Sequence, residues 1–367
     1  MSALEKMWAN DKAQGDTESD QRRGDSASVM RPPYIIYFGD AAAQGYAKTG
    51  LGLIEWRREL CIGQFRSPGC GVDGGLPDMT IAEAVEAGAK SFVIGIASAG
   101  GAIPERWVND LAAAARAGLD IVSGMHARLS AFPAIVAAAR ESGVRLVDVR
   151  TPPENLLIGT GAKRPGKRLL TVGADCAVGK KYSALALERE MRARGWDADF
   201  RATGQTGVMI AGSGFAIDSV VSDFLSGAAE VLSPAADESH WDVIEGQGAL
   251  SHPSFAGVSL GLLHGSQPDA LVMCLDPTRK NHLGTERAQS YAIPGLRECL
   301  ELNLLHSRRV NPSARFVGVC VNSRALGAGE RTAILEKYRA LTGLPVVDPL
   351  IDGVGPVIDR LETEFPR

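Results

Sequence analysis

The chain has 367 residues and a formal net charge of −4, a length that suffices for two domains of ordinary size. So small a charge excludes the broad basic surface of a nucleic-acid-binding protein and argues against binding to an anionic membrane. The sequence has no apolar run of membrane-spanning length, and its amino terminus lacks the apolar centre of a signal peptide. We therefore expect a cytoplasmic protein whose partners are small molecules, with neither nucleic acid nor membrane among them.

The first thirty residues are polar and mixed in charge, and apolar side chains do not cluster among them. Such a composition buries too little apolar surface to fold. We therefore expect residues 1–30 to form a disordered extension.

A regular alternation of strands and helices follows, beginning at the apolar segment 34–38. The expected helices end at glycines such as Gly118 and Gly143. This alternation predicts an α/β fold with a parallel sheet and right-handed crossovers in a first domain of residues 31–155. The expected elements are strands at 34–38, 91–96, 119–123 and 144–148 and helices at 105–117 and 131–142.

A segment rich in proline, glycine and lysine, 151–167, separates this domain from a second one, residues 156–367. The same alternation restarts there and predicts a second parallel sheet. Strands are expected near 169–173, 197–203, 241–245, 270–275 and 315–321, and helices near 180–194, 216–230, 256–264, 296–307 and 329–341.

The most informative motif is Gly-Ala-Asp-Cys-Ala-Val-Gly-Lys-Lys-Tyr-Ser at 173–183, between an expected strand and an expected helix. Backbone N–H groups of a glycine turn, a lysine and the positive end of a helix together form a phosphate-binding loop. The residue after Lys180 is a magnesium-holding Ser or Thr in nucleotide hydrolases, and here it is Lys181. Ser183 would replace it only if the helix began later. The loop retains the features that bind phosphate, and it has a second cation, Lys181, at the position of the usual metal ligand.

Cofactor contacts are expected from this loop and from the end of the strand at 315–321. The residues are Gly173, Asp175, Cys176, Ala177, Val178, Gly179, Lys180, Lys181, Ser183 and Asn322. The alternative is a glycine-rich turn that binds nothing. Cys176 is either a nucleophile activated at a helix amino terminus or a small residue that the loop tolerates.

Three residues are candidates for catalysis. Glu245 ends the strand at 241–245, and because ligands of parallel sheets bind beyond the carboxyl ends of the strands, it shares an edge with the phosphate loop. A carboxylate there acts as a general base, holds a metal or braces a loop. His252 titrates near neutrality, although a loop histidine is often structural. Asp218, in the expected helix 216–230, faces either the site or solvent.

Four polar residues are candidates for substrate binding. Arg279 follows the strand at 270–275 and offers a bidentate contact to a carboxylate, or else lies in solvent. Arg150 and Lys48 belong to the first half and would line a cleft between the domains, and Gln205 follows the strand at 197–203. The six cysteines include no C-x-x-C pair, so we expect neither a disulfide framework nor a zinc site, and no metal.

Two resemblances add to this interpretation. The loop at 173–183, together with Val-Ile-Glu-Gly-Gln-Gly at 243–248, resembles dethiobiotin-synthetase-like P-loop proteins. From about Tyr34 onwards the chain also resembles a bacterial family whose characterised members are D-glutamate N-acetyltransferases of the DgcN type. The stretches that carry the second resemblance are 46–50, 119–126, 147–150 and 245–253.

The resemblances imply a Rossmann-like N-terminal domain, a P-loop C-terminal domain and acetyl transfer from acetyl-CoA to an acidic amino acid, with D-glutamate as the expected acceptor. Coenzyme A carries phosphates that the loop would bind without hydrolysis. Arg279 or Arg150 would bind the acceptor, Glu245 or His252 would take its proton, and the enzyme would be a homo-oligomer. The glycine turns of the first half do not match a dinucleotide fingerprint, so an NAD-dependent activity is not expected.

Two other functions remain open at this point. One is an ATP-dependent ligase or carboxylase of the dethiobiotin-synthetase type, in which Glu245 would be a metal ligand. The other is a module that binds a nucleotide or coenzyme A without catalysis.

Overall fold

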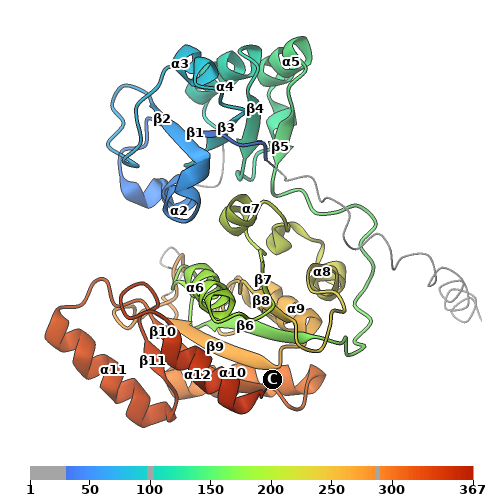
Figure 1. Ribbon diagram of the computed structural model, residues 1–367, viewed down its shortest axis with the longest axis vertical. Coiled ribbons are helices and arrows are strands. Elements are labelled where there is room, and N and C mark those ends of the chain that lie inside the picture. Colours follow the sequence, from blue (N-terminus) through green and yellow to red (C-terminus); the bar gives the residue numbers. More distant parts are fainter. Residues whose placement is uncertain (1–29, 97–102, 286–289, 367) are drawn as a thin grey trace, which may run out of the picture.

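The computed structural model describes residues 30–96, 103–285 and 290–366. Two α/β units lie one above the other in Figure 1, each built around its own parallel sheet. The expected disordered extension falls outside the described residues except for Met30, which is fully buried. In the described part of the chain, every helix is too short or too polar to cross a membrane.

The first sheet has the strand order β2-β1-β3-β4-β5. Its central strands are continuous apolar runs because helices cover both faces, as parallel sheets require. The helix α5 ends at Gly143, whose φ of 70° places it in the left-handed region that closes helices. The strands are β1 (Tyr34–Gly39), β2 (Cys61–Arg66), β3 (Ser91–Ile94), β4 (Asp120–Ser123) and β5 (Leu146–Asp148), and the helices are α2 (Lys48–Arg57), α3 (Ile81–Glu86), α4 (Glu105–Arg116) and α5 (Pro133–Ser142).

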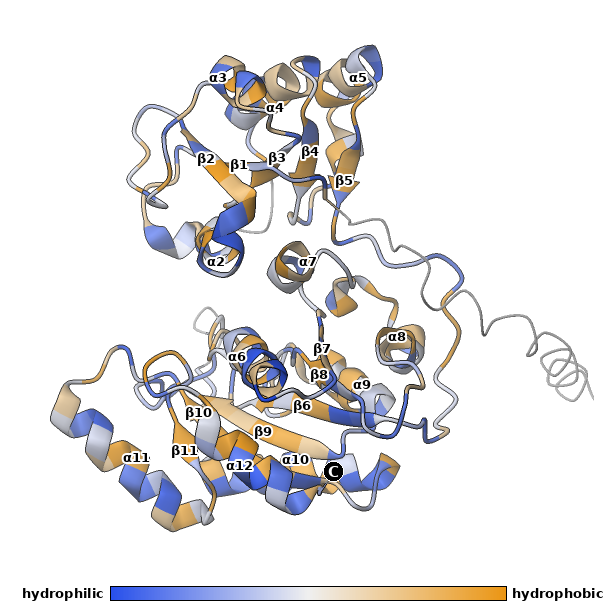
Figure 2. Cartoon of the chain, viewed as in Figure 1, coloured by the Kyte–Doolittle hydropathy of each residue, from blue (hydrophilic) through white to orange (hydrophobic). Residues whose placement is uncertain are grey.

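The second sheet has the order β11-β10-β9-β6-β8-β7, and all its strands run parallel. Figure 2 shows β9 and β10 mainly in the hydrophobic colour, whereas the helices of this unit mix hydrophobic and hydrophilic residues. Its strands are β6 (Lys167–Gly173), β7 (Ala198–Arg201), β8 (Trp241–Ile244), β9 (Ala270–Leu275), β10 (Arg315–Val321) and β11 (Val346–Val347), and its helices are α6 (Lys180–Ala193), α7 (Gln205–Ala211), α8 (Leu225–Leu232), α9 (Ala256–Ser266), α10 (Leu296–Val310), α11 (Ala328–Thr342) and α12 (Gly355–Glu364).

The expected helix 216–230 was wrong in its first half. Two short 3-10 turns, Ile217–Ser219 and Ser222–Phe224, precede α8, so Asp218 lies in a turn. The segment holds Ser219, Ser222 and Asp223, whose side chains compete with the backbone for helical hydrogen bonds, and two adjacent valines. Asp218 is therefore held next to the first domain, because its turn follows α7.

The helices α2 and α7 meet between the two units (Figure 1). The guanidinium of Arg57 in α2 donates to the carbonyl oxygen of Ile210 in α7 at 3.1 Å. Val208, Met209 and Ile210 are buried in the same apolar cluster as the strands of the first sheet. As a result, the segments that follow β1, β4 and β5 face the segments that follow β6 and β7.

Candidate functional site

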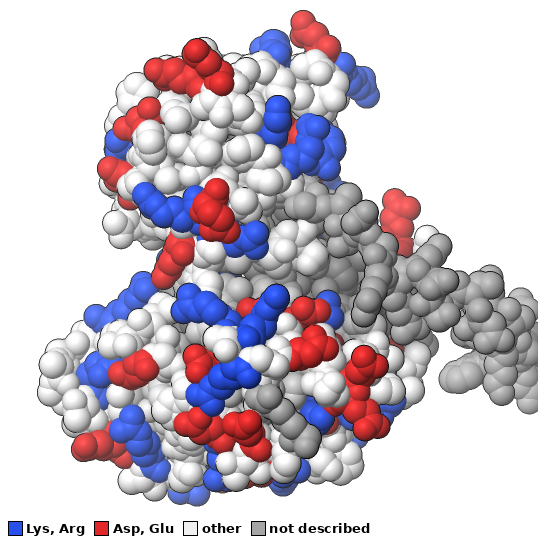
Figure 3. Space-filling view, viewed as in Figure 1, with Lys and Arg blue, Asp and Glu red and all other residues white. Residues whose placement is uncertain are grey.

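A cleft of about 700 Å³ lies between the two units and is lined by both. Figure 3 shows the molecule hollowed there, with Lys and Arg side chains on both rims and acidic side chains among them. Its volume is in the range of cofactor sites. The lining residues are 44–46, 48, 49, 51 and 55 of the first unit and 176–183, 204–206, 245–248, 320–322, 324 and 348–350 of the second.

The phosphate loop connects β6 to α6 and forms part of the cleft wall. Two of its residues, Ala177 (φ 53°) and Gly179 (φ 105°), take left-handed conformations that turn the backbone toward the helix amino terminus. The buried ammonium of Lys180 donates to the carbonyl oxygens of Asp175 and Gly248, both at 2.7 Å. Burial lowers the pKa of Lys180. Lys180 thus ties the loop to the turn after β8.

That turn approaches β6 so closely that only glycine fits. A Cβ on Gly246 would lie 1.6 Å from the carbonyl oxygen of Thr171, while the Gly246 N–H donates to the Thr171 hydroxyl at 3.0 Å. The two strand ends that the sequence singled out are therefore adjacent, as predicted from parallel-sheet geometry.

Lys181 is half-buried in the cleft wall and faces the first unit. Its Nζ lies 4.3 Å from the centre of the Tyr182 ring, and a Cβ on Gly52 of α2 would lie 3.4 Å from it. It makes no hydrogen bond or ion pair with any described residue. Burial lowers its pKa to about 8, although the negative charges of Glu245 and Glu55 oppose that shift.

Ser183, the residue that would replace the missing magnesium ligand, is buried. The helix begins at Lys180, as the sequence predicts, and the Ser183 hydroxyl accepts a bond from the thiol of Cys274 at 3.4 Å. Ser183 lies three positions beyond the start of the helix, and its hydroxyl is directed toward the strand β9. It therefore does not take the position of the missing magnesium ligand.

Glu245 is almost fully buried beside the loop. Its Oε2 accepts the backbone N–H groups of Thr203 at 3.0 Å and Gly204 at 3.1 Å. Burial raises its pKa, and the nearby charge of Lys181 partly offsets that effect. Glu245 therefore orders the start of α7 and has one carboxylate oxygen, Oε1, without a hydrogen bond among the described residues.

Asp175 is the centre of a buried network, and this determines the position of Arg279. Its Oδ2 accepts bonds from Arg279 at 2.7 Å and from the backbone N–H of Leu283 at 3.0 Å, and its Oδ1 lies 3.0 Å from Nδ1 of His282. Burial alone would raise the pKa of Asp175, but the bonds from Arg279 and His282 outweigh it and lower the pKa. Arg279 also donates to the carbonyl oxygen of Cys176. The guanidinium predicted to bind substrate thus holds the phosphate loop.

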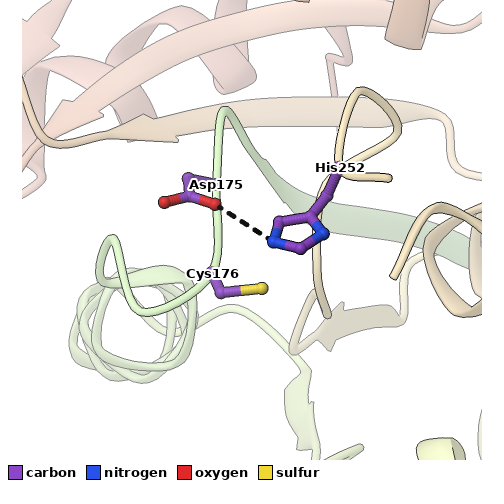
Figure 4. Close-up of side chains that lie close together, drawn as sticks. All are labelled: Asp175, Cys176 and His252. Atoms are coloured by element: carbon purple, nitrogen blue, oxygen red, sulfur yellow. Dashed lines mark ion pairs between the residues drawn. The ribbon is translucent and has the colours of Figure 1, made fainter. Parts of the chain in front are cut away.

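His252 lies against Asp175 and Cys176, and one atom of each could reach a shared metal ion, since the three atoms lie within 4.8 Å of one another (Figure 4). Both ring nitrogens of His252 already have backbone partners, however. Nε2 lies 3.0 Å from the carbonyl oxygen of Leu283, and Nδ1 accepts the N–H of Ser254 at 3.1 Å. Both ring nitrogens are therefore occupied by backbone groups, and neither is free to take a proton from substrate.

The thiol of Cys176 lines the cleft, but burial raises its pKa. A raised pKa reduces the thiolate fraction that nucleophilic attack requires. The direction of this pKa shift therefore gives no support to a covalent role for Cys176.

Arg150 and Asp218 lie together, away from the loop. The buried guanidinium of Arg150 binds the Asp218 carboxylate at 2.5 Å and the amide oxygen of Gln205 at 3.1 Å. Gln205 lines the main cleft, whereas Arg150 and Asp218 line a separate pocket of about 140 Å³. Three of the predicted site residues therefore form a chain from the cleft to this second pocket.

Of the remaining predicted residues, Lys48 and Asn322 line the main cleft, whereas Gly173 lies outside its lining. Sequence reasoning missed the segment before α2, Gln44–Tyr46, together with Glu55, Arg324 and the turn 348–350. The glycines of α2 obscured its helical pattern, although they also signalled close packing: a Cβ on Gly50 would lie 2.9 Å from the Cα of Gly95.

Residues 157–358 match the family described as the P-loop domain of DUF1611, a domain of unknown function, and residues 66–152 match its Rossmann-like domain. These matches confirm the predicted fold class of both domains. A crystal structure of a DUF1611 family protein from Anabaena variabilis superimposes with a TM-score of 0.81 at 30% sequence identity, covering 91% of this chain and 100% of that one.

Two curated relatives are similar along almost their whole length. A D-glutamate N-acetyltransferase of Pseudoalteromonas sp. is 46% identical over 332 residues, which cover 90% of this chain and 99% of the relative. A D-glutamate N-acetyltransferase of Tritonibacter scottomollicae is 44% identical over 333 residues, with coverage of 91% and 99%. These relatives confirm the resemblance seen in the sequence.

Proposed function

The chain belongs to the DUF1611 family, and from this premise we propose that it transfers the acetyl group of acetyl-CoA to the amino group of D-glutamate. The relatives are D-glutamate N-acetyltransferases, and nearly their whole length is present here. Within the structure, the cleft supports the proposal most. Its wall contains a phosphate loop that lacks the magnesium-holding hydroxyl, together with cations whose side chains make no hydrogen bond or ion pair with the described residues.

Three cations line the cleft without a side-chain hydrogen bond or ion pair among the described residues: Lys48, Lys181 and Arg324. Coenzyme A carries a pyrophosphate and a 3′-phosphate, so it needs several positive partners spread along one groove. The loop N–H groups and the amino end of α6 add to them. A donor bound in this way keeps its phosphates intact, because the reaction takes place at the thioester.

The chemical step requires a neutral amine, since only its free electron pair attacks the thioester carbonyl. The new C–N bond forms as the C–S bond breaks, and coenzyme A leaves as a thiol after taking up a proton. Two predicted carboxylates are candidates to take the proton of the amine: Glu245, beside the loop, and Asp218, beyond Gln205. Backbone N–H groups of the glycine turns are candidates to stabilise the oxyanion.

The direct test mixes the purified chain with acetyl-CoA and D-glutamate and follows free thiol with a colorimetric reagent. We expect thiol release that depends on D-glutamate, continues in the presence of EDTA and yields N-acetylglutamate by mass spectrometry. Turnover of Mg-ATP without thiol release would instead support a ligase of the dethiobiotin-synthetase type. Saturable binding of coenzyme A with no product from any amino acid would support a binding module.

We also retain the predictions of a homo-oligomer and of a cytoplasmic location. Sedimentation velocity of the full chain tests the first, and fractionation of cells that express it tests the second.

A further inference from the structure

The pocket of about 140 Å³ beyond Gln205 lies at the carboxyl edge of the first sheet. It is lined by residues that follow β4 (Met125, His126, Arg128), by residues at and after the end of β5 (Asp148, Arg150, Thr151), and by Asp218 and Ser219 of the second unit. Ligands of parallel sheets bind at this edge. The pocket has room for a small anion and is far too small for coenzyme A.

The length of the donor argues that the acceptor binds away from the phosphate loop. The pantetheine arm has about twelve bonds between phosphate and sulfur, each 1.3–1.5 Å long, and therefore reaches roughly 15 Å when extended. Glu245 lies at the phosphate end, because a Cβ added to its neighbour Gly246 would lie 3.1 Å from the side chain of Lys180. If the loop holds the phosphates and the arm is extended, the thioester lies well beyond Glu245.

The Gln205 side chain connects the two spaces. It lines the main cleft, and its amide oxygen accepts a bond from Arg150, which lines the second pocket. The hydrogen-bonded side chains of Arg150 and Gln205 therefore lie between the second pocket and the cleft.

The charges of the pocket match a dicarboxylic amino acid. The guanidinium of Arg128 is exposed and makes no hydrogen bond or ion pair with any described residue. Arg150 is a second cation, and its partner Asp218 is partly exposed. Asp148 supplies a second, partly exposed carboxylate of the pocket, which also accepts the backbone N–H of Leu129. The two cations can receive the two carboxylates of glutamate, and the two carboxylates that line the pocket favour a bound amino group.

We propose that this pocket is the acceptor subsite, in which Arg128 and Arg150 bind the two carboxylates of a short dicarboxylic amino acid and Asp218 contacts its amino group. The proposal rests on the proposed function for the position of the donor. It places Asp218 at the amine and so favours Asp218 over Glu245 as the proton acceptor. It also gives the first domain a role, that of recognising the acceptor.

The test measures binding to the full chain by isothermal titration calorimetry, with D-glutamate and with coenzyme A as separate probes. Arg128→Ala is compared with Arg324→Ala, an exposed arginine that lines the main cleft. We expect Arg128→Ala to weaken D-glutamate binding roughly 10- to 100-fold, the value of one or two charge-assisted hydrogen bonds, and to leave coenzyme A binding unchanged. Arg324→Ala should do the reverse.

Two further variants strengthen the comparison. Arg128→Lys keeps the charge and should recover part of the affinity for D-glutamate. Asp218→Asn should lower kcat far more than it raises KM for D-glutamate, and its thermal unfolding shows whether the chain still folds.

The outcomes separate this inference from the proposed function. D-glutamate binding that is sensitive to Arg128 supports the subsite even if no thiol is released. Thiol release in which Arg324→Ala raises KM for D-glutamate while Arg128→Ala does not overturns the subsite and leaves the transferase intact. A wild-type chain that binds neither D-glutamate, L-glutamate nor D-aspartate, with or without coenzyme A, also overturns it.

Discussion

The hydroxyl groups of Thr49 and Thr206 lie 3.2 Å apart, although 157 positions separate the two residues in the chain. Thr49 belongs to α2 of the first domain and Thr206 to α7 of the second. Thr206 directly follows Gln205, and the N–H of the preceding Gly204 binds Glu245. This contact therefore joins the two domains at the point where the cleft and the second pocket meet.

A double-mutant cycle with Thr49→Val and Thr206→Val tests that contact. Each valine keeps the shape and removes the hydroxyl, so we expect a coupling energy of about 0.5–1.5 kcal/mol in the free energy of unfolding. Thr363→Val, on the exposed side of α12, is the control and should couple with neither. Additive effects of the two substitutions would mean that the hydroxyls do not bind each other in solution.

Lys181 should make coenzyme A binding depend on pH. Its pKa of about 8 lies below the ordinary value of 10.5, and a bound phosphate would raise it. Binding above pH 8 must then take up a proton, so affinity should fall by up to roughly tenfold per pH unit there. Calorimetry at pH 7 and pH 9 measures this fall, and Lys181→Met should abolish the pH dependence above pH 8.

The same pKa has a consequence for stability. The unfolded chain binds more protons at Lys181 than the folded chain does between pH 8 and 10.5, so this residue makes unfolding less favourable as the pH rises through that window. Denaturant unfolding of the wild type and of Lys181→Met should diverge in that range. Parallel curves would show that burial does not lower the pKa of this lysine.

Arg279→Ala tests whether this arginine holds the loop or binds the acceptor. Loss of its bond to the buried carboxylate of Asp175 should destabilise the fold by about 2–3 kcal/mol and raise KM for acetyl-CoA. The exposed neighbour Lys280 is the control, and its alanine variant should change neither quantity. An increase in KM for D-glutamate alone would return Arg279 to the substrate site that the sequence suggested.

Gly246→Ala should be among the most damaging single substitutions in the second domain. Its Cβ would meet the Thr171 carbonyl at 1.6 Å, so β6 and the turn after β8 must separate, at a cost of about 3 kcal/mol or more. Gly257, exposed in α9 with no atom within 4 Å of a Cβ, is the control, and its alanine variant should be neutral or stabilise by about 0.5–1 kcal/mol. Thermal unfolding measures both.

His240 should give the second domain an alkaline limit of stability. Its bond to Asp242 raises its pKa to about 9 despite burial, and a further bond to Asp197 contributes. Because the folded pKa lies above the ordinary 6.5, the stabilisation is complete below about pH 6.5 and is lost as the pH rises through 9. His240→Gln should remove on the order of 2 kcal/mol near pH 6 and almost nothing near pH 10. Equal losses at both pH values would contradict the shift.

The sequence predicted the fold well where local patterns carry the information. The apolar runs at 91–96 and 270–275 and the helix that begins at Lys180 could be identified because periodicity and glycine signals agree there. The pattern failed in α2, where Gly50 and Gly52 serve close packing and weaken the helical signal. It also failed at 216–230, where serine side chains favour turns.

The candidate site was harder to predict than the fold, because partners in a network are not visible in one dimension. Arg279 and His252 have side chains suited to substrate binding and catalysis. In the structure, however, Arg279 binds Asp175, and both ring nitrogens of His252 bind backbone groups. Nothing in the local sequence shows that Asp175 is buried beneath them. Arg150 and Asp218, by contrast, come together only because α7 and its following turn pack against the first domain.

The facing carboxyl edges of the two sheets also bear on how molecules enter and leave. Residues of both domains line the cleft and the second pocket, and residues 149–166 connect the last strand of the first sheet to the first strand of the second. A rotation about that connection would widen both spaces together, so release of coenzyme A and release of an acetylated amino acid would share one opening event. If this rotation limits product release, kcat should fall as solvent viscosity rises, while the affinity for each substrate stays unchanged.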